Sequence, residues 1–320
     1  MAATASAGFL GRPDEADHFH DRGQALLAAH PGEYPWGVVQ LGLARCLACL
    51  ALGDLVTAWE VAERDYREIL AGPAPLMSAG PVGFRGLVEC AQGRPETAGR
   101  SLREAVTALQ GRDTIRLTGT LMSGLATASA LAGDAAAARS WVERAAYRDN
   151  GANRLFAPWA VLADAWARAA AGESSPAVAS AERAAALARE IGLPTVECRA
   201  HYDVARLGGD PDLARLDELG AALGTPYGRT LATAARALAN LDGDTLCDAA
   251  TDLARLGHVL PADRQGRHGG RTRGPAPRPL RGAVTPLLEY DRTGCSRAGN
   301  ARSPSWPPGT AASRSPSGSG

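Results

Sequence analysis

A short turn motif recurs along most of this chain, and it constrains the fold more than any other feature. Each copy is a glycine followed five residues later by an alanine, as in "GDLVTA" from Gly53 to Ala58. Successive glycines lie 42, 40, 40, 39, 37 and 34 residues apart. The predicted turn glycines are Gly11, Gly53, Gly93, Gly133, Gly172, Gly209 and, in a weaker copy, Gly243. A period of this size indicates an array of supersecondary units.

Each copy has the residues needed to end one helix and begin the next. Glycine adopts the left-handed conformation of a helix C-cap without a Cβ penalty. The alanine five residues later allows the second helix to lie close to its partner. These predicted close-packing alanines are Ala16, Ala58, Ala98, Ala138, Ala177 and Ala214. Between turns the apolar residues recur with a period near 3.6, and no stretch shows sustained β-branched alternation.

The prediction is therefore an all-α fold. Residues 1–263 are expected to form a tetratricopeptide-like α-solenoid of about six to seven helical hairpins. The period is longer than the usual tetratricopeptide length, and the full consensus of that repeat is absent. An irregular helical bundle is the simpler alternative.

Composition excludes several kinds of enzyme. All 34 basic residues are arginine, so the chain has no lysine for a Walker A phosphate loop or a Schiff base. No G-x-S-x-G nucleophile elbow is present. Cys46 and Cys49 have C-x-x-C spacing, and Cys198 and His201 lie one helical turn apart, but no further ligands accompany either pair. We expect buried side chains there, no enzymatic activity, no cofactor and no bound metal.

The aromatic residues supply the candidate ligand surface. Trp159 and Trp166 are seven residues apart, on one face of a predicted helix, and Tyr34 and Trp36 lie in a predicted turn. Aromatic side chains on the concave face of a solenoid suit a sugar or a peptide. Packing between repeats is the competing interpretation for each of them.

No signal for a membrane or for secretion is found. The chain has no apolar run of about 18 residues, and its N-terminus lacks a basic region followed by an apolar one. The sequence therefore predicts a cytoplasmic protein without a membrane partner.

Residues 264–320 differ from the rest of the chain. They contain ten arginines against Glu289 and Asp291, a net charge of +8, and are rich in Gly, Pro and Ser. Because the whole chain sums to zero, residues 1–263 carry −8. This pattern predicts a disordered basic tail. Read as it stands, the tail could bind nucleic acid through phosphates without sequence specificity.

Three stretches carry a more specific resemblance. They read "AVASAERAAALAREIGLPTVECRAHYDVARLGG", "LARLDELGAALGTPYGRTLATAARALANLDGD" and "LCDAATDLARLGHVLPAD". They resemble the helical region of large LuxR-type (MalT-like) actinobacterial transcriptional regulators, over roughly residues 40–263. In that class an ATPase module precedes a helical sensor, and a helix-turn-helix domain ends the chain. The absence of lysine rules out the phosphate loop of that ATPase.

The genetic code gives the tail a second interpretation. Shifted back by one base, codons for "SRAGNARSPSWPPG" can encode LTRREREVAELAAR, and those for "RSPSGSG" can encode EIAERLG. These strings resemble the start of a LuxR-type helix-turn-helix domain. The hypothesis is a frameshift near residues 262–266. Read as written, Pro304, Pro307, Pro308 and Pro316 would interrupt a recognition helix.

The resulting expectation is a fragment of a LuxR-family regulator. Its helical sensor would bind a protein or a small-molecule effector. DNA binding would belong to the intact family and not to this chain. The alternative is a stand-alone tetratricopeptide-like scaffold that binds a protein or peptide partner.

Overall fold

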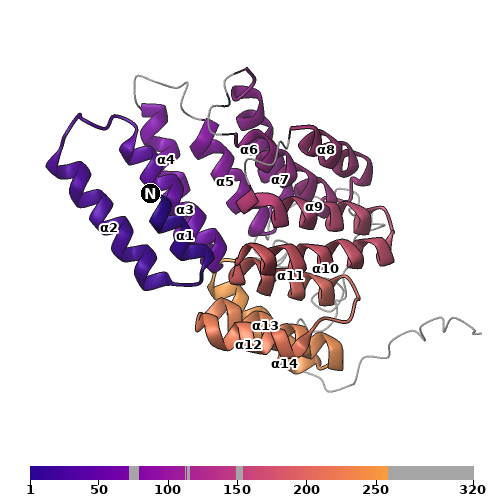
Figure 1. Cartoon of the computed structure of the whole chain (residues 1–320). Coiled ribbons are helices and arrows are strands. Elements are labelled where there is room, and N and C mark those ends of the chain that lie inside the picture. The colour runs from indigo at the N-terminus through magenta and orange to yellow at the C-terminus, as the bar shows by residue number, and fades with distance from the viewer. Residues whose placement is uncertain (72–78, 112, 114–115, 149–153, 259–320) are drawn as a thin grey trace, which may run out of the picture.

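The computed structural model describes residues 1–71, 79–111, 113, 116–148 and 154–258. These residues form fourteen α-helices and one short 3-10 helix, without any strand (Figure 1). The prediction of an all-α fold is confirmed. The predicted tail, residues 264–320, lies outside the described residues, as does the end of the predicted helical domain.

The helices follow one another with short connections. The first seven are α1 (Ala2–Phe9), α2 (Pro13–Ala29), α3 (Gly37–Leu52), α4 (Leu55–Ala71), α5 (Ala79–Ala91), α6 (Pro95–Ala108) and α7 (Thr118–Leu131). They are followed by α8 (Ala135–Arg148), η2 (Arg154–Phe156), α9 (Ala157–Ala170), α10 (Ser174–Ile191), α11 (Pro194–Arg206), α12 (Leu213–Leu223), α13 (Pro226–Asn240) and α14 (Gly243–Arg255).

Five of the predicted turn glycines have the left-handed conformation. They are Gly11, Gly53, Gly93, Gly133 and Gly172, with φ between 70° and 83°. Backbone hydrogen bonds close these turns in the same way. The amide after each glycine donates to the carbonyl five residues earlier, as from Asp134 to Ser129 at 2.9 Å. This bond is the mark of a Schellman motif and satisfies a carbonyl at the end of the helix.

The fourth residue of the helix after each turn is buried. In α2, α4, α6, α8 and α10 it is the predicted alanine, and all five alanines have 0% exposure. Its amide donates the first helical hydrogen bond, as from Ala98 to the carbonyl of Arg94 at 3.0 Å. The predicted alanines are thus fully buried at these five positions.

The last two turns differ from the prediction. Gly208, with φ 83°, is the left-handed residue of its turn, so the prediction of Gly209 is wrong. Gly243 is the first residue of α14, and Leu241 takes the left-handed C-cap of α13 with φ 54°. The connection after Gly208 is longer than in earlier turns and ends at the N-cap Asp212. This extra length moves the buried fourth position past Ala214.

Leucine takes the place of alanine in the last two units. Ala214 is exposed, against prediction, and the fourth residue of α12 is Leu216, which is 0% exposed. The fourth residue of α14 is Leu246, which is 5% exposed. In the final two units this buried position therefore holds a larger side chain than in the earlier ones.

The odd-numbered helices form a continuous inner row. Each helix packs against the next in the chain, and each odd-numbered helix from α1 to α13 also contacts the next odd-numbered one. This row bends back on itself, because α11 also contacts α1 and α3. The hydroxyl of Thr195 in α11 donates to the carbonyl of Phe9 in α1 at 2.9 Å. Figure 1 shows α11 to α14 lying below the first helices.

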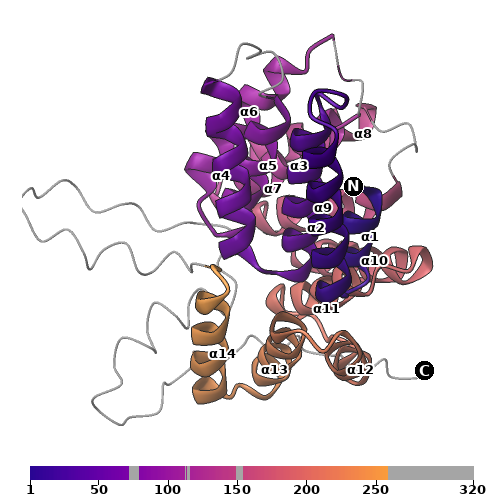
Figure 2. The ribbon, with the colours of Figure 1, turned by 90° about the vertical axis from the view of Figure 1, so that its left-hand side faces the viewer.

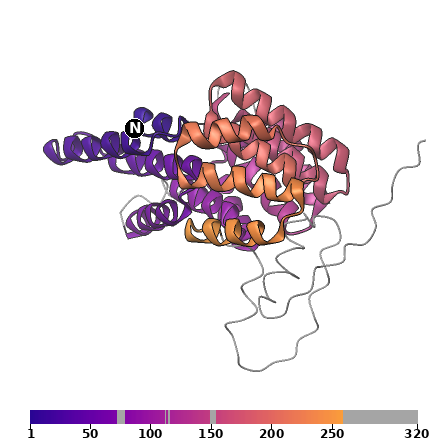
Figure 3. The ribbon, with the colours of Figure 1, turned by 90° about the horizontal axis from the view of Figure 1, so that it is seen from below.

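The end of α14 lies against the turn between α3 and α4 (Figure 2). The amide of Leu55 donates to the carbonyl of Leu256 at 2.8 Å, and His258 Nε2 donates to the carbonyl of Gly53 at 3.0 Å. The ring of His258 stacks on Tyr227 of α13, with centroids 4.9 Å apart. A Cβ on Gly53 would lie 2.2 Å from Cγ of Tyr227, so this contact requires glycine. We call these interactions of Tyr227, Leu256 and His258 with each other and with the turn between α3 and α4 the closing contact. Seen from below, the last three helices lie side by side in front of the middle of the molecule (Figure 3).

Close approach of α1 and α3 gives the first testable prediction. A Cβ on Gly8 would lie 2.4 Å from Cα of Ala48, which is backbone and cannot move aside cheaply. We therefore expect Gly8→Ala to lower the free energy of unfolding by about 1–3 kcal/mol, despite the better helix propensity of alanine. Urea denaturation measures the change.

The matched control is Gly99→Ala in α6. A Cβ on Gly99 would meet only the mobile guanidinium of Arg103, at 3.4 Å. Helix propensity should then dominate, and we expect Gly99→Ala to raise the free energy of unfolding by about 0.5–1 kcal/mol. Equal effects of the two substitutions would contradict the packing of α1 on α3.

Candidate functional site

A small hollow lies at the centre of the inner row. Its volume is about 70 Å³ and its walls come from α3, α5, α7, α9 and α11. The lining residues are Leu50, Leu87, Cys90, Ala91, Thr120, Ser123, Gly124, Thr127, Trp159, Leu162, Trp166 and Arg199. We call it the inner hollow. It collects side chains from helices that are up to about 150 residues apart in the sequence.

Two of the four predicted ligand-surface aromatics line the inner hollow. Trp159 and Trp166 lie on the same face of α9, as their spacing predicts. Trp159 also packs against Phe9 and Phe156, with ring centroids 5.7 Å apart in each case. It therefore forms part of the wall and anchors α1 to α9 at the same time.

Trp166 belongs to a buried polar cluster. Its indole Nε1 donates to Oδ2 of Asp203 at 3.4 Å, and Asp203 is only 1% exposed. The guanidinium of Arg206 lies 4.5 Å from the Trp166 ring centroid and donates to Oδ1 of Asp203 at 3.0 Å. Trp166 itself is 2% exposed, so its main contacts are with protein.

The other two predicted aromatics lie elsewhere. Tyr34 and Trp36 are in the connection between α2 and α3, where they are 60% and 47% exposed. Trp36 is the N-cap residue of α3. Neither residue lines the inner hollow or the larger cavity described next. The structure does not bring the four aromatics together into one surface.

A larger cavity opens between α7, α8, α9 and α10. Its volume is about 530 Å³, within the range typical of small-molecule sites. The lining residues are Asp113, Arg116, Thr118, Gly119, Thr120, Ser123, Val142, Ala145, Ala146, Phe156, Ala157, Ala160, Val161, Asp164 and Arg183. We call it the outer cavity. Thr120 and Ser123 line both cavities, so the two adjoin at α7.

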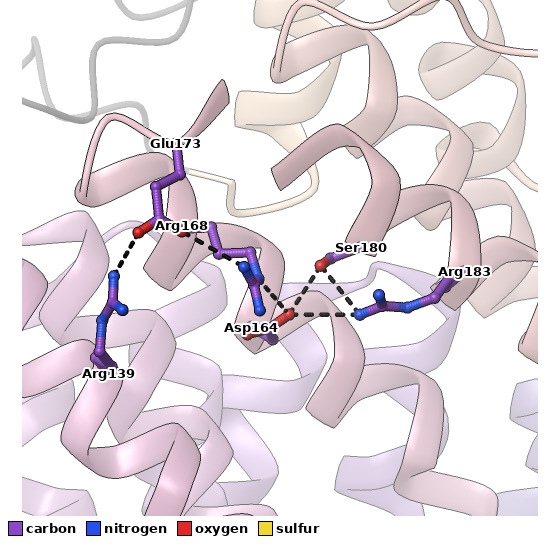
Figure 4. A network of polar contacts seen from close by, with 6 residues as sticks. All are labelled: Arg139, Asp164, Arg168, Glu173, Ser180 and Arg183. Carbon is purple, nitrogen blue, oxygen red and sulfur yellow. Dashed lines mark hydrogen bonds and ion pairs between the residues drawn. The ribbon is translucent and has the colours of Figure 1, made fainter. Parts of the chain in front are cut away.

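Charged side chains are fixed along one side of the outer cavity (Figure 4). Oδ2 of Asp164 accepts hydrogen bonds from Nε of Arg168 and Oγ of Ser180, both at 2.8 Å. The same oxygen lies 3.5 Å from Nη2 of Arg183. Hydrogen bonding to Asp164 raises the pKa of Arg168. Asp164 is therefore held in place by Arg168 and Ser180. Arg183, which is 65% exposed, lies at the rim, where its Nη2 also donates to Oγ of Ser180 at 3.1 Å.

The network continues towards α8. Glu173, the N-cap residue of α10, binds Arg168 at 3.4 Å and Arg139 of α8 at 2.6 Å (Figure 4). These exposed or half-exposed pairs each contribute little to stability, about 0–1 kcal/mol. Their effect is geometric, since they link α8, α9 and α10 around the outer cavity.

The two residue pairs with metal-ligand spacing, Cys46 with Cys49 and Cys198 with His201, lie within helices α3 and α11. Burial raises the pKa of Cys49 and of Cys198 to about 12, and it raises that of Cys46 well above its ordinary value. These three thiols therefore keep their protons at neutral pH. Burial also lowers the pKa of His201. Within the described residues, no group of three or more His, Cys, Asp or Glu side chains is placed to hold a metal ion.

Sequence reasoning missed the polar residues of both cavities. Thr120, Ser123 and Thr127 occupy one face of α7 at spacings of three and four residues, which is a readable helical pattern. Arg199 gives no local signal, because it reaches the inner hollow only when α11 folds back against the first helices. Together the cavities combine apolar walls with hydroxyls and a few charges, an arrangement suited to binding a small molecule.

No protein-family model matches this chain, and no curated protein or solved structure matches it either. Among the described residues, no helix is long and apolar enough to cross a membrane.

Proposed function

We propose that this chain is a non-enzymatic, cytoplasmic sensor that binds a small-molecule effector in the outer cavity. The observation that carries this proposal is the cavity of about 530 Å³ between α7 and α10, whose lining combines charged residues such as Asp164 and Arg183 with apolar ones such as Phe156. The helix pairs stack as a tetratricopeptide-like α-solenoid. In this arrangement the effector contacts four consecutive helices and changes how they pack.

We further propose that this sensor derives from a LuxR-family transcriptional regulator. Support comes from the resemblance of residues 40–263 to the helical region of such regulators and from the shifted-frame strings in residues 296–320. DNA binding belongs to the intact family and not to this chain. Resequencing the gene from codon 250 past the stop tests the lineage. One inserted or deleted base that restores LTRREREVAELAAR supports it. A confirmed frame without a helix-turn-helix in the alternative one refutes it.

A second candidate function rests on the exposed aromatic pair. Tyr34 and Trp36 flank the start of α3, and the neighbouring Val38 is 57% exposed. Exposed aromatic and apolar side chains that lie together favour contact with a protein or peptide. A stand-alone scaffold would use this surface and leave the outer cavity empty.

Filling the outer cavity separates these two functions. Ala160 lines the cavity and is half-buried, so Ala160→Phe places a ring in the space that an effector would occupy. A panel of sugars, nucleotides, amino acids and organic acids is tested for a rise in Tm. At about 100 times Kd, a true effector should raise Tm of the wild type by about 5–10 °C. Ala160→Phe should abolish that rise.

The control places the same ring on an exposed alanine. Ala222 in α12 is exposed and lines neither cavity, so Ala222→Phe should keep the full effect of the effector on Tm. A panel without any active compound would count against the sensor. An effector that raises Tm equally in Ala160→Phe would place its binding site elsewhere.

A further inference from the structure

The inner hollow contains a charged side chain that no neighbour fully compensates. Arg199 projects from α11 into the space between α3, α5, α7 and α9. Its side chain keeps 34% of its exposure although it lies within the inner row of helices. The hollow is therefore lined by a charged side chain that remains partly exposed.

The carboxylate nearest to Arg199 is already engaged. Nε of Arg199 lies 3.9 Å from Oδ2 of Asp203, which is beyond hydrogen-bond distance. Asp203 instead accepts hydrogen bonds from Trp166 and Arg206. The guanidinium groups of Arg199 and Arg206 thus share the carboxylate of Asp203. Within the described part of the chain, Arg199 makes no hydrogen bond, so its N–H donors are free to bind a ligand.

The remaining walls favour an anion over a cation. The hydroxyl of Thr120 has no hydrogen-bond partner among the described residues and can donate to a ligand. The thiol of Cys90 stays protonated at neutral pH, because burial raises its pKa to about 12. The hydroxyls of Ser123 and Thr127 already donate to backbone carbonyls of α7. Leu87 and Leu162 add apolar walls, which strengthen an ionic interaction there. A volume of about 70 Å³ leaves room for a few waters or one small oxyanion.

We propose that the inner hollow is an oxyanion site in which Arg199 binds a phosphate or a carboxylate group. This inference rests on the proposed sensor function and deepens it: the two cavities adjoin at Thr120 and Ser123, so an effector in the outer cavity would extend an anionic group into the inner hollow. The guanidinium provides paired N–H donors in the geometry that both kinds of oxyanion accept. Thr120 adds one donor from α7. Binding would link α11 to α7 and so tie the C-terminal helices to the middle of the array.

Isothermal titration calorimetry on the full chain tests this site with inorganic phosphate and, separately, with succinate. The ionic strength is held constant with sodium chloride, because general screening would otherwise imitate binding. We expect saturable binding of at least one anion to the wild type, and the two titrations distinguish phosphate from carboxylate. Arg199→Gln should raise Kd at least tenfold, the effect of losing charge-assisted hydrogen bonds.

Control variants keep the test informative. Arg67→Gln makes the same substitution at a side chain that is 76% exposed, and it should leave Kd unchanged. Thr120→Val removes the unpaired hydroxyl and should raise Kd about 2- to 10-fold. Circular dichroism checks that each variant folds. If Arg199→Gln does not fold, Arg199→Lys takes its place. Lysine retains the positive charge but lacks the paired N–H donors of the guanidinium, so this variant should still weaken binding.

Two results would overturn the assignment. One is the failure of both anions to bind the folded wild type. The other is unchanged affinity in folded Arg199→Gln, or in both Arg199→Lys and Thr120→Val. Failure of the sensor function looks different, because no compound of the effector panel would then bind. An effector whose binding is lost in Ala160→Phe but retained in Arg199→Gln would overturn only the role of Arg199.

Discussion

Leu216→Ala is expected to lower the free energy of unfolding by about 2–5 kcal/mol. Leu216 is the fourth residue of α12 and has 0% exposure. It occupies the position at which five earlier helices have alanine, so its neighbours are spaced for a larger side chain. Truncation would leave a void between α12 and the helices beside it, because packed helices relax only partly. Urea denaturation, with the m-value checked for two-state behaviour, measures the loss.

Ala214→Leu serves as the control for this prediction. Ala214 occupies the close-packing position according to sequence spacing alone, and enlarging it would then be costly. In the structure Ala214 is exposed, so Ala214→Leu should change the free energy of unfolding by no more than about 0.5 kcal/mol. A large loss in Ala214→Leu with a small loss in Leu216→Ala would show that α12 has the sequence-predicted register.

Acid is expected to weaken the closing contact through His258. The pKa of His258 is lowered from an ordinary value of 6.5 to about 4, chiefly by burial, and the charges of Arg199 and Arg206 act in the same direction. The hydrogen bond to the Gly53 carbonyl and the carboxylate of Asp54 act in the opposite direction. Between pH 6.5 and pH 4 the unfolded chain therefore binds a proton that the folded chain does not.

The sign and the size of the effect follow from this difference. Stability from His258 is complete above pH 6.5 and is lost as the pH falls towards 4. One pKa unit corresponds to about 1.4 kcal/mol, so the full loss is about 3 kcal/mol. Denaturant titrations from pH 7 to pH 4 measure it.

His258→Gln isolates this contribution from the carboxylates that titrate in the same range. Glutamine stays neutral and retains an N–H donor for the Gly53 carbonyl. The difference in stability between the wild type and the variant should change by about 3 kcal/mol across the titration, because only the wild type takes up this proton. Parallel pH profiles would show that His258 is not buried against Tyr227.

The helical array was readable from the sequence because its signals are local. A left-handed glycine and an alanine one turn into the next helix need only neighbouring residues, and five such turns are confirmed. The prediction is wrong where the local signal is ambiguous. "LGGD" offers two adjacent glycines, and spacing alone selects Gly209 although Gly208 has the left-handed conformation. A Cβ on Gly209 would lie 2.5 Å from Val178, so this position also requires glycine. At Leu241 a non-glycine residue takes the left-handed conformation, which no spacing rule predicts.

The candidate site was predictable only in part. Helical spacing places Trp159 and Trp166 together, because both belong to α9. It cannot place Arg199 beside them, since this depends on α11 returning to α1 and α3. The same limit explains why spacing did not predict where Tyr34 and Trp36 lie. Their exposure is determined by which helices cover the start of α3, and the sequence around them does not encode this.

The closing contact changes how the chain can fold. In an open repeat array each unit is stabilised only by its neighbours, so segments can form and fray in turn. Here Leu256 bonds to Leu55, and Thr195 bonds to Phe9, across separations of about 200 residues in sequence. Bringing together residues this far apart in sequence lowers the conformational entropy of the chain before the contacts between them can form. We therefore expect the two ends of the array to gain their stability together, because each lacks these contacts until the other has formed.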